Sequence, residues 1–222
     1  MPPSRDQAPA GPPWRYMIDG ARSSASTRRL RARADQPPNP ASRLCMSFFT
    51  RLVFVVMRLR FRVEIEGAFP AAGCVAVSLH DSYWDGPLVA ALDPRVAPVT
   101  SKRWRRIPLV GWLLDVYGVI WTGESVIEQS VDVARRGSVC WVAPYGFDRG
   151  GPRRQPHPGA AVIAIDSGRP IVPLKLTGLR RSARARRPRS PVRVEIGEPL
   201  HPAEGESVED LTARCEAQLR EG

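Results

Sequence analysis

Short apolar runs rich in β-branched residues recur along the chain after residue 60. They lie at residues 60–67, 73–79, 96–101, 118–122, 138–144, 170–178 and 192–200. Helical periodicity fills most of the intervals between them, at residues 83–93, 107–117, 124–137 and 158–168, and a last amphipathic helix covers 207–222. Because strands that alternate with helices favour a parallel sheet covered by helices, we predict an α/β fold with a mostly parallel central sheet.

The most apolar stretch precedes the first strand, at residues 44–60. Arg51 and Arg58 interrupt it, so its uncharged runs are shorter than the roughly 20 residues that cross a bilayer. On a helix these two arginines share one face and four apolar side chains share another, namely Phe48, Leu52, Val55 and Leu59. This pattern predicts an amphipathic helix that lies either on a membrane surface or on its own domain.

Composition and charge indicate the character of the N-terminal segment and of an arginine-rich run. Residues 1–43 are rich in Pro, Arg and Ser and lack the apolar segment of a secretory signal, which predicts a disordered basic tail before a domain at 61–222. The net charge is +11, which favours an anionic partner such as a membrane surface, a phosphorylated ligand or nucleic acid. A run with six arginines at 179–190 is either a solvated loop or part of such a contact.

The cysteines and histidines indicate no metal centre and no disulfide framework. Cys45, Cys74, Cys140 and Cys215 are widely spaced and form no Cys-x-x-Cys motif, so we predict reduced thiols in a cytoplasmic protein. Besides His80, the chain has only His157 and His201, both in proline-rich segments. We therefore expect neither a bound metal nor a bound cofactor.

His80 and Asp85 form a candidate catalytic pair in the segment Leu-His-Asp-Ser-Tyr-Trp-Asp-Gly. His80 follows a predicted strand, and ligands of open α/β sheets bind at the carboxyl ends of strands. If the next helix begins at Ser82, the Asp85 carboxylate can reach back to the imidazole, fix its tautomer and leave the other ring nitrogen as a general base. The alternative is that Ser82 and Asp85 form a helix cap and His80 is a polar loop residue.

Four blocks in order resemble the glycerolipid acyltransferase family, which includes the bacterial 1-acyl-sn-glycerol-3-phosphate acyltransferases. The first block is the segment around His80 and Asp85, which resembles the family's His-x₄-Asp motif. The second contains Lys102, and the third is Val-Ala-Pro-Tyr-Gly-Phe-Asp-Arg-Gly-Gly, where the family has Phe-Pro-Glu-Gly-Thr-Arg. The fourth is Arg-Pro-Ile-Val-Pro-Leu-Lys-Leu-Thr-Gly, so the resemblance runs from about Phe61 to Pro202.

The resemblance implies an O-acyltransferase of phospholipid or lipid biosynthesis. His80 would deprotonate the acceptor hydroxyl and Asp85 would orient His80. The hydroxyl would then attack an acyl thioester carried by coenzyme A or by acyl carrier protein. The residues implied for substrate binding are Lys102, Arg106, Tyr145, Gly146, Phe147 and Arg149. Lys102 and Arg106 could equally belong to an exposed cationic helix face.

The sequence departs from the family pattern mainly in the third block. Tyr145 and Phe147 stand for the family's Glu and Thr, Asp148 stands for its Arg, and Glu124 stands for an arginine of the second block. Leu79 stands for the Asn before the histidine. With these changes, the resemblance supports acyl transfer as the reaction more than it supports lysophosphatidate as the acceptor. Tyr145 and Phe147 would line a more apolar acceptor pocket, which would suit another lysolipid, a glycolipid or another hydroxylated lipid.

Two functional hypotheses remain open at this point. The first is a peripheral enzyme at the cytoplasmic face of the cell membrane, with a lipid acceptor, an acyl thioester donor and an anionic membrane surface as its partners. The second is a catalytically degenerate member of the family that binds anionic lipid or nucleic acid. Nucleic acid is the weaker partner of the second hypothesis, because no stacking-aromatic motif accompanies the arginines.

Overall fold

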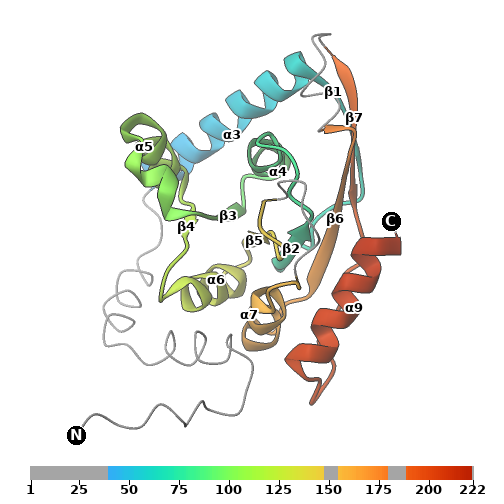
Figure 1. Ribbon diagram of the computed structural model, residues 1–222. Coiled ribbons are helices and arrows are strands. Elements are labelled where there is room, and N and C mark those ends of the chain that lie inside the picture. Colours follow the sequence, from blue (N-terminus) through green and yellow to red (C-terminus); the bar gives the residue numbers. More distant parts are fainter. Residues whose placement is uncertain (1–39, 148–154, 180–188, 222) are drawn as a thin grey trace, which may run out of the picture.

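The computed structural model describes residues 40–147, 155–179 and 189–221, and these form a seven-stranded sheet with helices on both faces (Figure 1). The strands are β1 (Phe61–Glu66), β2 (Cys74–Ser78), β3 (Val96–Thr100), β4 (Ile120–Trp121), β5 (Val139–Val142), β6 (Ile171–Thr177) and β7 (Ser190–Ile196). The helices in these ranges are α3 (Pro40–Arg60), α4 (Asp85–Leu92), α5 (Pro108–Tyr117), α6 (Val126–Arg135), α7 (Gly159–Ser167) and α9 (Val208–Glu221). Each overlaps a predicted segment, so the predicted α/β fold is confirmed. A 3₁₀ helix, η1 (Lys102–Arg106), was not predicted.

The sheet has the strand order β1-β7-β6-β2-β5-β3-β4. Strand β2 lies at its centre and pairs in parallel with β5 and β6. Strands β3 and β4 extend the parallel region beyond β5, and β1 pairs in parallel with β7. Strand β7 returns antiparallel to β6, which accounts for the one reversed pairing among the described strands. The carboxyl ends of β2, β3 and β5 therefore meet at one edge, where parallel sheets bind ligands.

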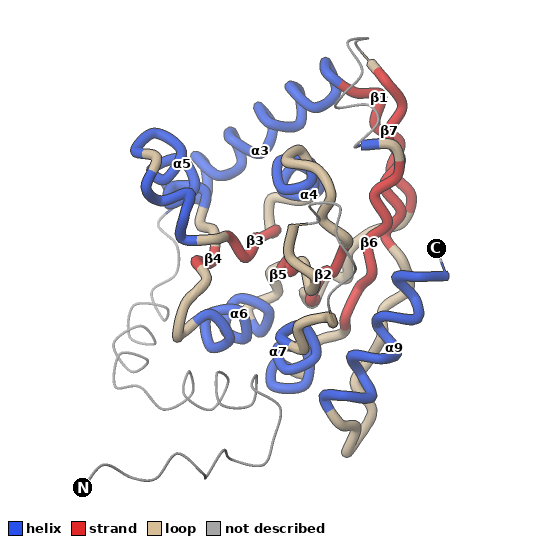
Figure 2. Tube along the Cα trace, viewed as in Figure 1, coloured by secondary structure: helices blue, strands red, loops and turns tan. Residues whose placement is uncertain are grey.

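Alternate residues of β2 face two separate cores. Cys74 and Ala76 pack in the core shared with α4, whereas Val75 and Val77 pack in the core shared with α6, α7 and α9. Figure 2 shows the corresponding layers, with α3 and α4 on one side of the strands and α6 and α7 on the other. Because both faces of β2 are buried, its side chains are small, and apolar residues fill four successive positions before Ser78 without alternating with polar ones.

Helix α3 begins at Pro40, four residues before its predicted start, so residues 40–43 are helical and not part of the predicted tail. Proline suits the first turn of a helix because its missing N–H is not needed there. Met57 is buried, and Val53 and Phe54 pack beside it against the domain. The opposite face stays exposed and contains all four residues of the predicted apolar face, together with Val56. The rest of the predicted tail and most of the arginine-rich run lie outside the described residues.

Cys74, Cys140 and Cys215 are free, buried thiols. Burial raises the pKa of each to about 12, so all three are protonated at neutral pH. Thiolate chemistry at these positions is therefore suppressed, and the three side chains serve as small apolar core residues.

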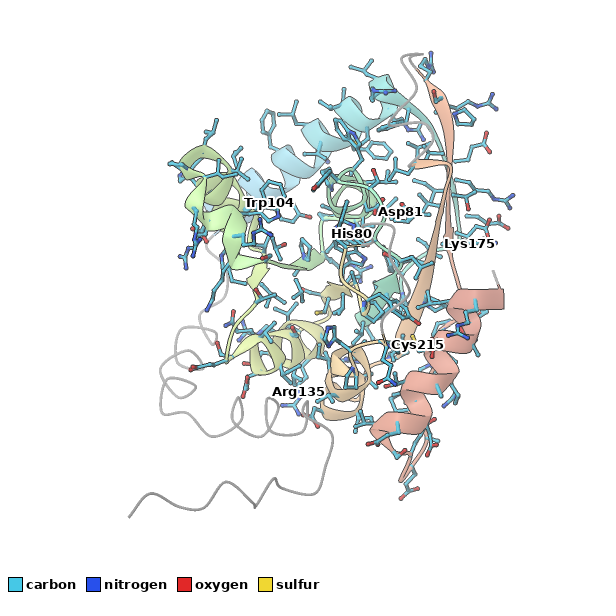
Figure 3. The ribbon with its side chains drawn as sticks, in the orientation of Figure 1. His80, Asp81, Trp104, Arg135, Lys175 and Cys215 are labelled. Carbon is cyan, nitrogen blue, oxygen red and sulfur yellow. The ribbon has the colours of Figure 1, made fainter. Side chains whose placement is uncertain are left out.

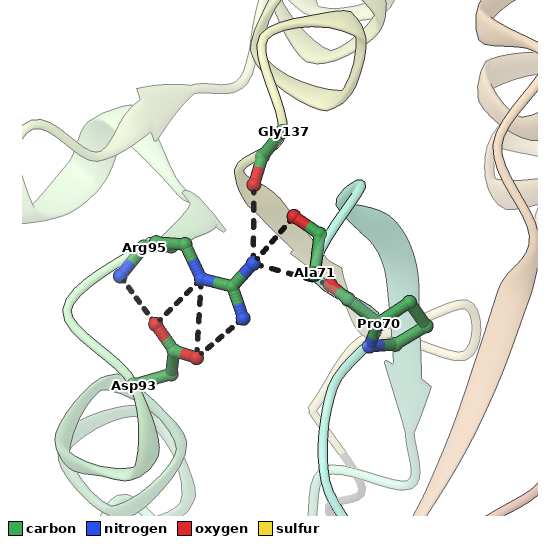
Figure 4. A network of polar contacts seen from close by, with 5 residues as sticks. All are labelled: Pro70, Ala71, Asp93, Arg95 and Gly137. Carbon is green, nitrogen blue, oxygen red and sulfur yellow. Dashed lines mark hydrogen bonds and ion pairs between the residues drawn. The ribbon is translucent and has the colours of Figure 1, made fainter.

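The Arg95 guanidinium ties together three connections at the amino ends of the strands (Figure 4). Its Nε and one terminal nitrogen donate to the Asp93 carboxylate at 3.1 and 2.8 Å. The other terminal nitrogen donates to the carbonyls of Pro70 and Ala71 at 3.1 and 2.9 Å, and to that of Gly137 at 3.5 Å. These contacts fix the starts of β2, β3 and β5 relative to one another, at the edge of the sheet opposite His80.

Replacement of Arg95 tests this network. We expect Arg95→Ala to lower the free energy of unfolding by about 2 kcal/mol, because the Asp93 carboxylate and three carbonyls lose a charged donor. Arg62→Ala is the matched control, since the exposed Arg62 forms an ion pair with the exposed Glu64 at 3.0 Å, and it should cost less than about 0.5 kcal/mol. Urea unfolding of both variants measures the difference, and equal losses would contradict the assigned role of Arg95.

Candidate active site

His80 lies just beyond the carboxyl end of β2, where two connections meet. Its backbone forms an isolated parallel bridge with Phe147, which follows β5. Since β2 and β5 are neighbours in the sheet, residues from their two following loops come together although they are far apart in sequence. Figure 3 shows the labelled His80 side chain in this region, between α4 and the central strands.

The Asp85 carboxylate holds the imidazole of His80. Its Oδ2 lies 2.8 Å from His80 Nδ1 and accepts the backbone N–H groups of Asp81 and Ser82, both at 2.9 Å. The Asp85 side chain is only 1% exposed, whereas that of His80 is 23% exposed. With Asp85 ionised, Nδ1 carries the proton and donates it, which leaves the lone pair of His80 on Nε2. The side chains therefore have the geometry of a base and its orienting carboxylate.

Helix α4 begins at Asp85, within the predicted segment 83–93, and not at Ser82, the start that the dyad hypothesis assumed. Residues 82–84 form a turn in which the Asp85 N–H donates to the Ser82 carbonyl at 3.1 Å. The Ser82 hydroxyl accepts the Trp84 N–H at 3.3 Å, and the Asp85 carboxylate accepts the Ser82 N–H. One carboxylate oxygen of Asp85 thus makes the contact to His80 that the dyad hypothesis requires and the contact to the Ser82 N–H that a capping box requires, and the catalytic role of the pair stays a prediction.

Aromatic rings surround His80. Phe147 contacts it edge to face at 4.8 Å between ring centroids, and Trp141 does so at 5.7 Å. The Trp141 indole N–H donates to the Ser78 hydroxyl at 2.9 Å, which fixes this ring beneath the imidazole loop. Tyr83 stacks on Phe147 at 4.6 Å with an interplanar angle of 24°. Sequence reasoning missed Tyr83 and Trp141, although Tyr83 lies between the two predicted catalytic residues.

The third block sends its two aromatic side chains in different directions. The Tyr145 hydroxyl donates to Glu216 of α9 at 2.7 Å, while Phe147 lies against His80. Gly146 between them adopts the left-handed conformation, with φ of 65°, and its N–H donates to Ala143 O at 3.0 Å. Arg149 lies outside the described residues. The expected roles of Tyr145, Gly146 and Arg149 in substrate binding stay predictions.

Lys102 and Arg106 lie at the two ends of η1, and both are exposed. The Lys102 ammonium lies directly against Gly123, at the end of β4. Trp104 of the same helix contacts Tyr83 edge to face at 6.3 Å, so η1 approaches the dyad through an aromatic side chain. Substrate binding by Lys102 and Arg106 also stays a prediction. Both residues do lie on an exposed cationic helix, as the alternative interpretation expected.

The remaining histidines are separate from His80. His157 lines a small, open pocket between the third block and α9, together with Tyr145 and Cys215. His201 is exposed after β7. Across residues 40–147, 155–179 and 189–221, no three His, Cys, Asp or Glu side chains gather in a way that could hold a metal ion.

The sequence model of the acyltransferase family matches residues 60–177, which is more than half of the chain and includes both dyad residues. The chain belongs to the acyltransferase family. It is 25% identical over 193 residues to a 1-acyl-sn-glycerol-3-phosphate acyltransferase of Pseudomonas aeruginosa, an alignment that covers 77% of this chain and 71% of the relative. The predicted family and the predicted enzyme class, an acyltransferase, are thereby confirmed.

The fold of this acyltransferase is similar to a solved structure. The crystal structure of PlsC, the 1-acyl-sn-glycerophosphate acyltransferase of Thermotoga maritima, superposes with a TM-score of 0.68 at 20% sequence identity. The match covers 93% of this chain and 88% of PlsC. At this identity the likeness shows the shared mixed α/β fold.

The contact between Tyr145 and α9 leads to a prediction about this residue. Tyr145→Phe removes the hydroxyl that Glu216 accepts, so the free energy of unfolding should fall by about 1 kcal/mol. The acceptor KM of the variant should stay within about twofold of wild type, because the ring is kept and the phenol is committed to α9. Thermal unfolding and steady-state kinetics measure the two effects. A large rise in KM at unchanged stability would place Tyr145 in the acceptor site.

Proposed function

We propose that this acyltransferase moves a fatty acyl group from acyl-CoA or acyl carrier protein to the hydroxyl of a lipid acceptor. The observation that carries the proposal is the 2.8 Å contact between His80 Nδ1 and a buried Asp85 carboxylate that two backbone amides hold in place. The names of its relatives support a lysophospholipid or a related lipid as the acceptor class. The reaction would then belong to phospholipid or lipid biosynthesis.

The proposed mechanism needs no covalent enzyme intermediate. His80 Nε2 takes the proton of the acceptor hydroxyl as the oxygen attacks the thioester carbonyl. The resulting tetrahedral intermediate collapses, the carbon–sulfur bond breaks, and the imidazolium returns its proton to the departing thiolate. Asp85 keeps the ring in one orientation and stabilises its transient positive charge. Such a positioned base typically contributes about 10²- to 10⁴-fold in rate.

The exposed cations of η1 could bind the phosphate groups of the acyl donor. Coenzyme A and the prosthetic group of acyl carrier protein both carry phosphate, and Lys102 and Arg106 present their charges to solvent beside the carboxyl end of β3. Trp104 between them leads to Tyr83 and the dyad. Donor binding along η1 would bring the thioester to His80 from this side.

Removal of the imidazole tests the proposed chemistry. We expect His80→Ala to lower kcat/KM by about 10²- to 10⁴-fold while the protein stays folded. His201→Ala, which changes an exposed histidine away from β2, is the matched control and should leave the rate unchanged. Transfer of a radiolabelled acyl group from acyl-CoA and from acyl carrier protein onto a panel of lipids measures both variants. Equal rates for His80→Ala and wild type would refute the dyad, and no transfer by folded wild type would favour the degenerate binding protein.

We also propose that the enzyme works at an anionic membrane surface. No helix among the described residues has the length and hydropathy needed to cross a bilayer. Yet α3 and α5 lie in contact, and each exposes large apolar side chains, the most exposed being Leu59, Phe48, Leu109 and Trp112 at 60–70%. Arg51 and Arg58 are exposed on the same helix α3. Apolar and cationic side chains on one surface suit a bilayer with anionic headgroups.

Charge reversal on α3 tests membrane binding. Arg58→Glu should weaken binding to vesicles that contain phosphatidylglycerol by roughly fivefold or more, since each well-placed cation contributes about 1 kcal/mol. Lys175→Glu makes the same charge change at an exposed position of β6, outside the α3–α5 surface, and should have a smaller effect. Co-sedimentation with and without phosphatidylglycerol measures binding. Equal effects of the two variants would mean that net charge, and not α3, directs the protein to the membrane.

A further inference from the structure

A continuous series of aromatic rings leads from η1 to His80. Trp104 contacts Tyr83, Tyr83 stacks on Phe147, and Phe147 contacts the imidazole edge to face. We call the stacked pair Tyr83 and Phe147 the aromatic wall. The two rings come from different loops, one between the dyad residues and the other after β5, so the fold itself brings them together beside the base.

The aromatic wall is not part of a core. Tyr83 is 70% exposed and Trp104 is 38% exposed, whereas large core side chains such as Leu88 are fully buried. Phe147 covers one side of the Tyr83 ring, and most of the phenol remains accessible. The exposed Tyr83 ring, which is linked to the imidazole through Phe147, is available to a ligand that approaches His80.

Two of the four cations of η1, Lys102 and Arg105, have contacts away from the dyad. The Lys102 ammonium is against Gly123 at the end of β4. Arg105 pairs with Asp115 at 3.5 Å and lies over the Trp121 ring at 5.7 Å. Among the described residues, the rings in contact with the imidazole are thus those of Phe147 and Trp141, and Lys102 and Arg105 have contacts elsewhere.

The chemistry of an aromatic wall favours a neutral ligand. The faces of aromatic rings are electronegative, so they repel an anion and attract polarised C–H groups. The ligand must also present a hydroxyl within about 2.6–3.2 Å of His80 Nε2 for proton transfer. A sugar ring meets both requirements, because it carries C–H groups on its faces and hydroxyls around its edge.

We propose that the acceptor of this enzyme is a lipid with a neutral sugar headgroup, which lies on the exposed ring of Tyr83, backed by Phe147, while one of its hydroxyls faces His80. The assignment of the hydroxyl as acyl acceptor rests on the function proposed above. The aromatic wall thus sets the acceptor class, and Tyr83 and Phe147 are specificity-determining residues.

Binding of two small amphiphiles tests the wall without any catalytic step. Octyl β-D-glucoside and octyl phosphate, both below their micellar concentrations, are titrated into the full-length protein by calorimetry. We expect the glucoside to bind more tightly than the phosphate. Tyr83→Leu and Phe147→Leu keep apolar bulk but remove the ring, and each should weaken glucoside binding by roughly 3- to 10-fold. Ile65→Ala, at an exposed position of the edge strand β1, is the control and should leave binding unchanged.

Acyl transfer to a monoglucosyl lipid, with radiolabelled acyl-CoA, completes the test. The two leucine variants should raise the acceptor KM more than they lower kcat, since the wall binds ground state and transition state alike. Tighter binding of octyl phosphate, or glucoside binding that neither variant changes, would overturn the inference. Ring-dependent glucoside binding without transfer to any acceptor would support the wall and refute the proposed acyl transfer.

Discussion

One carboxylate oxygen, Oδ2 of Asp85, joins the folding of the β2–α4 connection to the orientation of His80. It accepts two backbone amides that turn the chain after β2, and it lies 2.8 Å from the imidazole. The side chain is buried, so no solvent competes for these contacts. The loop conformation and the catalytic geometry therefore depend on the same group. Substitution of Asp85 would change both, which makes His80 the better position for separating chemistry from stability.

The sequence was sufficient to predict where the helices and strands lie, but not which strands pair with one another in the sheet. Doubly buried strands such as β2 are short apolar runs, and glycines such as Gly168, with φ of 66°, end helices in the left-handed conformation. Strand order and the antiparallel return of β7 depend on long-range pairing that no local pattern encodes. Helix α4 begins at Asp85 because the carboxylate binds the amides of Asp81 and Ser82, and this contact holds those residues in a turn.

The dyad was predictable because its two members are five residues apart, whereas the rest of the site is assembled from distant segments. Tyr145 and Phe147 are equivalent in a sequence pattern, yet one reaches Glu216 in the last helix and the other reaches His80. Which of the two side chains turns toward α9 depends on where α9 packs, and the sequence around residues 145–147 does not determine that. The same limit applies to α3: Met57 packs on the domain, while Phe48 and Leu59 of the predicted apolar face stay exposed, and the membrane-surface role of that face stays a prediction.

In the proposed acceptor site, the placement of Tyr83 would let acceptor choice change independently of His80. Its backbone lies in the turn between His80 and Asp85, but Asp85 Oδ2 holds His80 and the amides of residues 81 and 82. The Tyr83 side chain can therefore vary while the dyad keeps its geometry. Phe147 has less freedom, because its backbone bridges that of His80. If the proposed aromatic wall selects the acceptor, differences in acceptor class would arise at the side chains of these two positions, with the main chain at residue 147 still paired with the histidine.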